Sequence, residues 1–132
     1  MVDRIAFDLV SPERLLLSEE AEMVTVPGSD GDFGVMAGHM PVISTLRPGV
    51  IDVRGGTEGD ARFFVLGGFV EANPQKITVL AEEATPMQEV DASLLDQRIQ
   101  NAEEDIHIAR TEAERAKAVE TVGTLKLLRA AL

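Results

Sequence analysis

The sequence predicts an antiparallel β-sandwich or barrel over residues 1–86, followed by an antiparallel hairpin of two α-helices over residues 87–132. Three observations support this fold class. Up to Pro86, short apolar alternations are separated by turn signals every eight to twelve residues. After Pro86 there is no proline, and glycine is absent until Gly123. Apolar residues in this last third recur three and four positions apart, which is typical of amphipathic helices.

The β-rich part is expected to contain eight or nine short strands. Residues 5–10 alternate in polarity and predict a half-buried strand. A turn at 11–14 precedes a strand at 15–17 and an acidic segment at 18–22. The other expected strands are 24–26, 42–46, 49–54, 61–66, 69–72 and 76–80. The hairpin turn at 55–60, the bulge or bend at 67–68 and the turn at 73–75 are marked by Gly, Asn and Pro.

A glycine-rich stretch, VTVPGSDGDFGVMAGHMPVISTLRPG, occupies residues 24–49. Gly28, Gly31 and Gly34 recur every third residue, with Asp30 and Asp32 between them. Such spacing indicates backbone with positive φ or a close approach to another surface. Short carboxylates suit these turns because they can accept hydrogen bonds from nearby backbone N–H groups. We therefore expect a rigid, acidic loop on a β scaffold, closed by a type II turn with residues 48 and 49 at its centre.

This stretch does not match the common sequence patterns for ligand sites. It lacks both glycine patterns of phosphate-binding loops, and its acidic residues would repel phosphate. A calcium loop requires further carboxylates beyond Asp30 and Asp32. His39 has no cysteine and no second histidine nearby, so we expect no metal site and no catalytic residue here.

Two helices are predicted after the composition changes. Asp91 or Ser93 can cap the first, and Thr111 with Glu114 forms a capping box that starts the second. The first apolar stripe consists of Leu95, Ile99, Ala102, Ile106 and Ala109. The second consists of Ala118, Val122, Leu125, Leu128 and Leu132. Facing stripes of this kind predict a helical hairpin.

Composition excludes several classes of function. The formal net charge of −11 disfavours binding to nucleic acid or anionic lipid but permits a basic protein partner. The absence of cysteine excludes a disulfide framework. No apolar run approaches the length of about 20 residues that spans a bilayer, and residues 1–11 do not resemble a signal peptide. We expect a soluble, cytoplasmic protein without direct membrane insertion.

Four short motifs in this stretch follow the order found in one protein family. They are Pro27-Gly28, Gly31-Asp32-Phe33-Gly34-Val35, Gly38-His39-Met40-Pro41 and Leu46-Arg47-Pro48-Gly49. In this order they resemble the signature of the epsilon subunit of the bacterial F-type ATP synthase, in its proteobacterial form. The resemblance covers the whole chain and is weakest in the last third. It implies a sandwich of roughly ten strands and a mobile regulatory arm.

The resemblance also implies partners. The subunit belongs to the rotor, and couples the gamma subunit to the membrane c-ring on the cytoplasmic face of the bacterial inner membrane. It has no catalysis and no cofactor of its own. The positions that correspond to the c-ring loop are Asp30, Gly31, Asp32 and Phe33. Those in the segment close to gamma are His39, Met40 and Pro41.

The predicted arm carries basic residues that the resemblance directs toward the alpha and beta subunits. They are Arg110, Arg115, Lys117, Lys126 and Arg129. Some family members also bind ATP through an Asp-x-x-Arg-Ala motif, but here Asp91 is followed by Leu94 and Leu95 at the Arg-Ala positions. We therefore expect no ATP binding. A stand-alone β-sandwich binding module and an ATP-sensing switch are the alternative functions.

Overall fold

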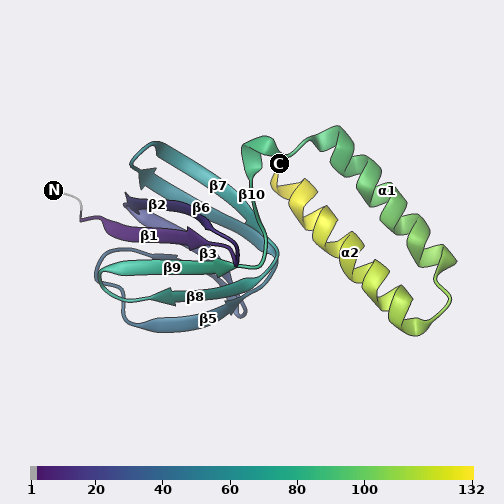
Figure 1. The fold of residues 1–132 in the computed structure, drawn as a ribbon, viewed down its shortest axis with the longest axis horizontal. Coiled ribbons are helices and arrows are strands. Elements are labelled where there is room, and N and C mark those ends of the chain that lie inside the picture. Colours follow the sequence, from purple (N-terminus) through teal and green to yellow (C-terminus); the bar gives the residue numbers. More distant parts are fainter. Residues whose placement is uncertain (1–2) are drawn as a thin grey trace. The chain divides into compact units, whose positions relative to one another are not determined.

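The computed structural model describes residues 3–132, so Met1 and Val2 lie outside the described residues. They belong to the predicted 1–86 domain and to the segment 1–11 that is unlike a signal peptide. The chain forms two compact units, Met1–Gln88 and Glu89–Leu132. Figure 1 shows that the first unit is built from strands and the second from helices.

The first unit contains ten strands within the described residues, as the sequence resemblance implied. They are β1 (Ile5–Val10), β2 (Leu15–Ala21), β3 (Met23–Gly28), β4 (Gly31–Val35), β5 (Val42–Leu46), β6 (Gly49–Gly56), β7 (Gly59–Val65), β8 (Gly68–Ala72), β9 (Lys76–Ala81) and β10 (Ala84–Pro86). A 3₁₀ turn, η1 (Met87–Glu89), follows the last strand.

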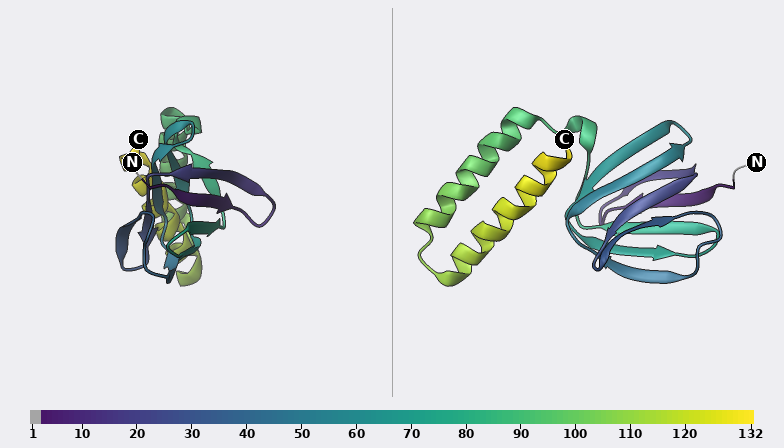
Figure 2. Two further views of the ribbon diagram at one scale, coloured as in Figure 1. Left: turned by 90° about the vertical axis from the view of Figure 1, so that its left-hand side faces the viewer. Right: turned by 180° about the vertical axis from the view of Figure 1, so that it is seen from behind.

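The strands follow the order β10-β7-β6-β3-β5-β8-β9-β1-β2, and β4 pairs with β3 outside this path. All pairings are antiparallel except that of β1 with β9, which is parallel. The sheet curls back on itself, as the two views of Figure 2 show. The amide N–H of Glu22 donates to the carbonyl oxygen of Arg54 across 2.9 Å, which connects the end of β2 to β6.

The core of the first unit is aliphatic and follows the alternation of its strands. In β1 the side chains of Ile5, Phe7 and Leu9 are fully buried. The other strands contribute inward residues of the same kind, such as Ile51 and Val79. Each such side chain stabilises the fold by about 1.5–3 kcal/mol when it is removed from water. The unit therefore provides a rigid support for the turns at its surface.

The second unit contains α1 (Ala92–Ile108) and α2 (Glu112–Ala131), side by side in Figure 1. The Asp91 carboxylate caps α1 by accepting from the amide N–H of Leu94 across 3.1 Å. Thr111 caps α2 through the amide N–H of Glu114, again at 3.1 Å. The Glu114 carboxylate accepts from the amide of Arg110, one residue before the position expected in a capping box.

The two apolar stripes are largely confirmed. Their buried members are Leu95, Ala102, Val122, Leu125 and Leu128. Leu132, however, is exposed, so its predicted place in the second stripe was wrong. α2 ends at Ala131, and Leu132 has therefore left the helical repeat that would align it with Leu128. Among residues 3–132, neither helix is long and apolar enough to cross a membrane.

Three other local predictions were wrong. Residues 31–35, expected as a loop, form β4, because the backbone of Gly31–Val35 pairs along β3. The acidic residues 18–20 belong to β2 and pair with β1. Gly49 begins β6 and lacks the positive φ of a type II turn. A Cβ on Gly49 would lie 2.8 Å from the Cβ of Pro27, so close approach accounts for this glycine.

Candidate docking site at the β3–β4 turn

The β3–β4 turn carries the predicted acidic site at its tip. β3 ends at Gly28 and β4 begins at Gly31, so Ser29 and Asp30 alone make the connection, and both are exposed. Gly31 has a φ of 138°, which L-residues rarely adopt. A Cβ on Gly28 would lie 2.7 Å from the Phe33 ring, so the base of the turn is tightly packed. The fold thus presents Asp30 at the end of a rigid two-residue turn.

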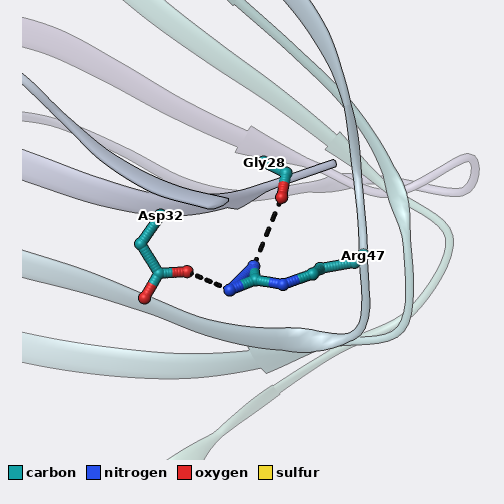
Figure 3. A network of polar contacts seen from close by, with 3 residues as sticks. All are labelled: Gly28, Asp32 and Arg47. Carbon is teal, nitrogen blue, oxygen red and sulfur yellow. Dashed lines mark hydrogen bonds and ion pairs between the residues drawn. The ribbon is translucent and has the colours of Figure 1, made fainter. Parts of the chain in front are cut away.

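Asp32 is held differently from the sequence prediction. Its carboxylate was expected to accept backbone N–H groups, but it forms an ion pair with Arg47, with 2.6 Å between Oδ1 and Nη2. The same guanidinium donates from Nη1 to the carbonyl oxygen of Gly28 across 3.3 Å. Figure 3 shows Arg47 reaching across from the β5–β6 connection to both groups. Sequence reasoning missed this role of Arg47, because nothing local links residues 15 positions apart.

The segment with His39 lies next to this turn. The rings of Phe33 and His39 have their centroids 6.3 Å apart and are tilted by 31°. The amide of His39 donates to the Met36 carbonyl across 3.1 Å, and Nδ1 of His39 lies 2.6 Å from the Met40 carbonyl oxygen. The structure therefore brings Phe33, predicted for the c-ring loop, together with His39, predicted for the segment close to gamma. Met40 and Pro41 are exposed.

An exposed apolar face on β5, β8 and β9 was not anticipated. Phe69 lies opposite Thr45 on one side and opposite Leu80 on the other, so these side chains share the outer face of the sheet. Phe69 and Leu80 are exposed, and Ile43, two residues before Thr45 on β5 and therefore on the same face, is 74% exposed. We call Ile43, Phe69 and Leu80 the apolar patch. Its sequence signal is the presence of large apolar residues at consecutive positions of one strand, as in Phe69-Val70, because consecutive side chains point to opposite faces of the sheet.

The five basic residues of the predicted arm do not form one cluster. Lys126 Nζ lies 3.8 Å from a Glu103 oxygen, and Arg129 Nε lies 2.8 Å from Asp96 Oδ1, so both pair with α1. Arg110 and Lys117 line an open cleft of about 590 Å³ between the helices. Arg115 lies on the exposed surface of α2. The hairpin therefore satisfies part of its own positive charge.

Within the described residues, no group of three or more His, Cys, Asp or Glu side chains could hold a metal ion. Hydrogen bonds from Lys76 and Ser18 lower the pKa of the Asp8 carboxyl below its ordinary value of 3.8. The Lys76 ammonium lies 2.8 Å from this carboxylate, and the Ser18 hydroxyl lies 2.7 Å from it. This network spans β9, β1 and β2 and stabilises the sheet.

The family model described as "ATP synthase, Delta/Epsilon chain, beta-sandwich domain" matches residues 4–87. The match covers most of the first unit, from before β1 to the start of η1.

Similar chains define the family more closely. The ATP synthase epsilon chain of Parvibaculum lavamentivorans is 49% identical over 129 residues, covering 98% of both chains. That of Rhodospirillum rubrum is 45% identical over 131 residues, covering 99% of this chain and 98% of its own. This chain belongs to the ATP synthase epsilon chain family. Its relatives are named as one subunit of a larger enzyme.

Solved structures agree with this assignment. One chain of the Euglena gracilis mitochondrial ATP synthase, from a structure of OSCP, F1 and the c-ring, is similar with a TM-score of 0.86 and 25% identity. The match covers 97% of this chain and 81% of that one. A chain from the central stalk and c-ring of the Tetrahymena thermophila enzyme has the same fold, with a TM-score of 0.73, 18% identity, and coverage of 98% and 96%.

Proposed function

We propose that this chain is a non-catalytic rotor subunit of a proton-translocating F-type ATP synthase. In this proposal it couples the gamma subunit to the c-ring and modulates ATP hydrolysis. The observation that carries the proposal is the similarity of the whole chain to ATP synthase epsilon chains; the rigid β3–β4 turn and the exposed apolar patch offer surfaces for partners. Torque transmission requires stiff contacts, and a hydrogen-bonded sandwich supplies them. The complex would hold the protein peripherally on the cytoplasmic face of the membrane.

The c-ring contact is assigned to Asp30, Gly31, Asp32 and Phe33. The polar loops of c subunits typically include basic side chains, and the turn offers them carboxylates. Asp30 is exposed at the tip, whereas Asp32 already pairs with Arg47. Charge complementarity of this kind sets the register and rate of encounter more than the affinity. Asp30 is thus the more available of the two carboxylates.

The gamma contact is assigned to His39, Met40 and Pro41. Met40 is exposed and lies two residues before β5, and the proposed contact extends from it over the apolar patch of Ile43, Phe69 and Leu80. Exposed apolar side chains that share a sheet face commonly mark protein interfaces. The proposal therefore gives one sandwich two adjoining surfaces, an acidic tip for the c-ring and an apolar face for gamma.

The helical unit, residues 87–132 in the sequence prediction, is proposed as the regulatory arm. Its cations would meet acidic groups of the alpha and beta subunits when α2 leaves α1. In the hairpin, Lys126 and Arg129 are engaged by α1, and the inner stripe is buried. Leaving the hairpin exposes that stripe, so the closed arrangement is favoured at rest. Inhibition of hydrolysis by the arm is accordingly weak or conditional.

Charge reversal at the tip tests the proposal. Asp30→Lys with Asp32→Lys is expected to weaken docking on the c-ring and to uncouple proton flow from ATP turnover in membrane vesicles. Glu58→Lys is the matched control, because Glu58 is an exposed acid in the β6–β7 turn. Normal coupling by the double variant, over a range of salt concentrations, would reject the docking role of the tip. A pull-down from solubilised membranes that fails to recover gamma and the c-ring would favour a stand-alone binding module.

A further inference from the structure

Arg47 has a placement that the proposed docking contact alone does not explain. It belongs to the β5–β6 connection, yet its guanidinium contacts groups on both sides of the β3–β4 turn. Nη1 lies 3.3 Å from the carbonyl oxygen of Gly28, the last residue before the turn, and Nη2 lies 2.6 Å from Oδ1 of Asp32, the second residue after it. One planar cation thus connects the end of β3 to the start of β4.

The backbone of Arg47 is itself fixed against β3. Its amide N–H donates to the Pro27 carbonyl oxygen across 3.0 Å, and the amide of Ser29 donates to the Thr45 carbonyl oxygen across 3.0 Å. Leu46, the residue before Arg47, pairs with Gly28 in the β3–β5 ladder. The guanidinium therefore starts from a backbone position that the sheet holds in place.

This arrangement changes what the tip offers to a partner. Asp30 and Asp32 carry two negative charges, and Arg47 reduces the local sum to one. Arg47 engages only one carboxylate oxygen of Asp32; in Figure 3 the other oxygen points away from Arg47. A carboxylate held by one fork of an arginine has its remaining oxygen oriented for a second donor. Fixing a group in its bound orientation lowers the entropic cost of binding.

We propose that Arg47 is a positioning residue that holds Asp32 oriented to accept a basic side chain from a docking protein loop. This inference rests on the proposed function, because it concerns the same acidic tip. Two opposite effects of Arg47 can be separated. As a bare charge, Arg47 repels a basic partner, so its removal would tighten binding. As a positioning group it keeps Asp32 in place, so its removal would weaken binding.

The test measures association and dissociation rates of the full-length subunit on immobilised ATP synthase stripped of its own copy. Arg47→Met is expected to raise the dissociation rate by about threefold to tenfold, in the range of one ordinary net hydrogen bond, although the tip becomes more negative. Arg47→Lys keeps the charge but lacks the fork that spans Gly28 and Asp32, so its effect is intermediate. Thermal melting of each variant checks the fold, since an exposed ion pair contributes little to stability.

A double-mutant cycle completes the test. In an Asp32→Ala background, Arg47→Met is expected to leave the dissociation rate unchanged or to lower it, because no oriented carboxylate remains to be lost and only the repulsion by the Arg47 charge is removed. Unchanged or tighter binding by Arg47→Met alone, or an equal effect in both backgrounds, would overturn the positioning role. If the tip variant with Asp30→Lys and Asp32→Lys also binds normally, the proposed docking function fails as well. Weakened binding by that variant alone rejects only the role of Arg47.

Discussion

The buried apolar stripe of α2 (Val122, Leu125 and Leu128), rather than the ion pairs of α2 with α1, is expected to keep the helical hairpin closed. Leu125 is 7% exposed, and truncating a buried leucine to alanine costs about 2–5 kcal/mol. The Arg129 and Asp96 side chains are 43% and 57% exposed, so their pairing contributes about 0–1 kcal/mol. Leu125→Ala should therefore shift the equilibrium toward the open hairpin by about 30-fold or more, and Arg129→Ala by about fivefold or less.

Hydrogen exchange of the α2 backbone amides in the full-length protein measures these shifts. Leu127→Ala is the matched control, because Leu127 lies on the same helix, undergoes the same truncation and is 47% exposed. Alanine has a higher helix propensity than leucine, so faster exchange in the Leu125 variant cannot come from a weaker helix. Equal loss of protection in Leu125→Ala and Arg129→Ala would refute the reasoning, since charge pairing would then hold the hairpin as strongly as burial does.

Three further predictions concern other parts of the chain. The pKa of Asp8 is lower in the folded than in the unfolded protein, so its ion pair stabilises the fold fully above about pH 4 and this contribution is lost as the pH falls through the folded pKa. The free energy of unfolding of Asp8→Asn, measured by denaturation, should therefore be lower than that of the unsubstituted protein by about 1 kcal/mol or less at pH 7, and this difference should disappear in acid. A difference that does not change with pH would contradict this. Gly68→Ala should prevent or strongly weaken folding, because the added Cβ would overlap the Leu80 carbonyl oxygen. Gly67→Ala is the control: Gly67 also has a positive φ but has more space, so this variant should melt only somewhat lower. Equal melting points for the two variants would contradict the clash. Calorimetry with millimolar ATP should give no saturable heat, since Leu94 replaces the expected arginine; saturable binding would mean that another residue substitutes.

Local chemistry explains which structural features were predictable. The cap at Thr111 was predicted, and Asp91 was one of two candidates with Ser93 for the other cap, because a cap depends on residues within one turn of the helix. The strand β4 was missed because its two glycines resemble a loop in sequence, while its pairing with β3 decides its conformation. Gly49 was assigned to a turn for the same reason, although the contact with Pro27 explains it. Tertiary contacts override local preference at these positions.

The candidate site was predictable in its position but not in its electrostatics. Asp30 and His39 were proposed as site residues from the motif order, and the structure brings their segments together through the contact of Phe33 with His39. The pairing of Asp32 with Arg47 could not be predicted, because a contact between a strand and a distant connection leaves no periodic signal in one sequence. The apolar patch left only a partial signal, since Phe69-Val70 indicates apolar residues on both faces of a strand, but the strand register is needed to tell which of them is exposed.

The parallel pairing of β1 with β9 has a consequence for synthesis on the ribosome. β1 and β2 can form their hairpin early, but the other edge of β1 waits for Lys76–Ala81 to leave the exit tunnel. An unpaired edge is a template for other chains, and pairing over such a separation is slow. A pause in translation between these strands therefore prolongs the time during which the β1 edge can pair with other chains, and a chaperone that covers this edge would protect it.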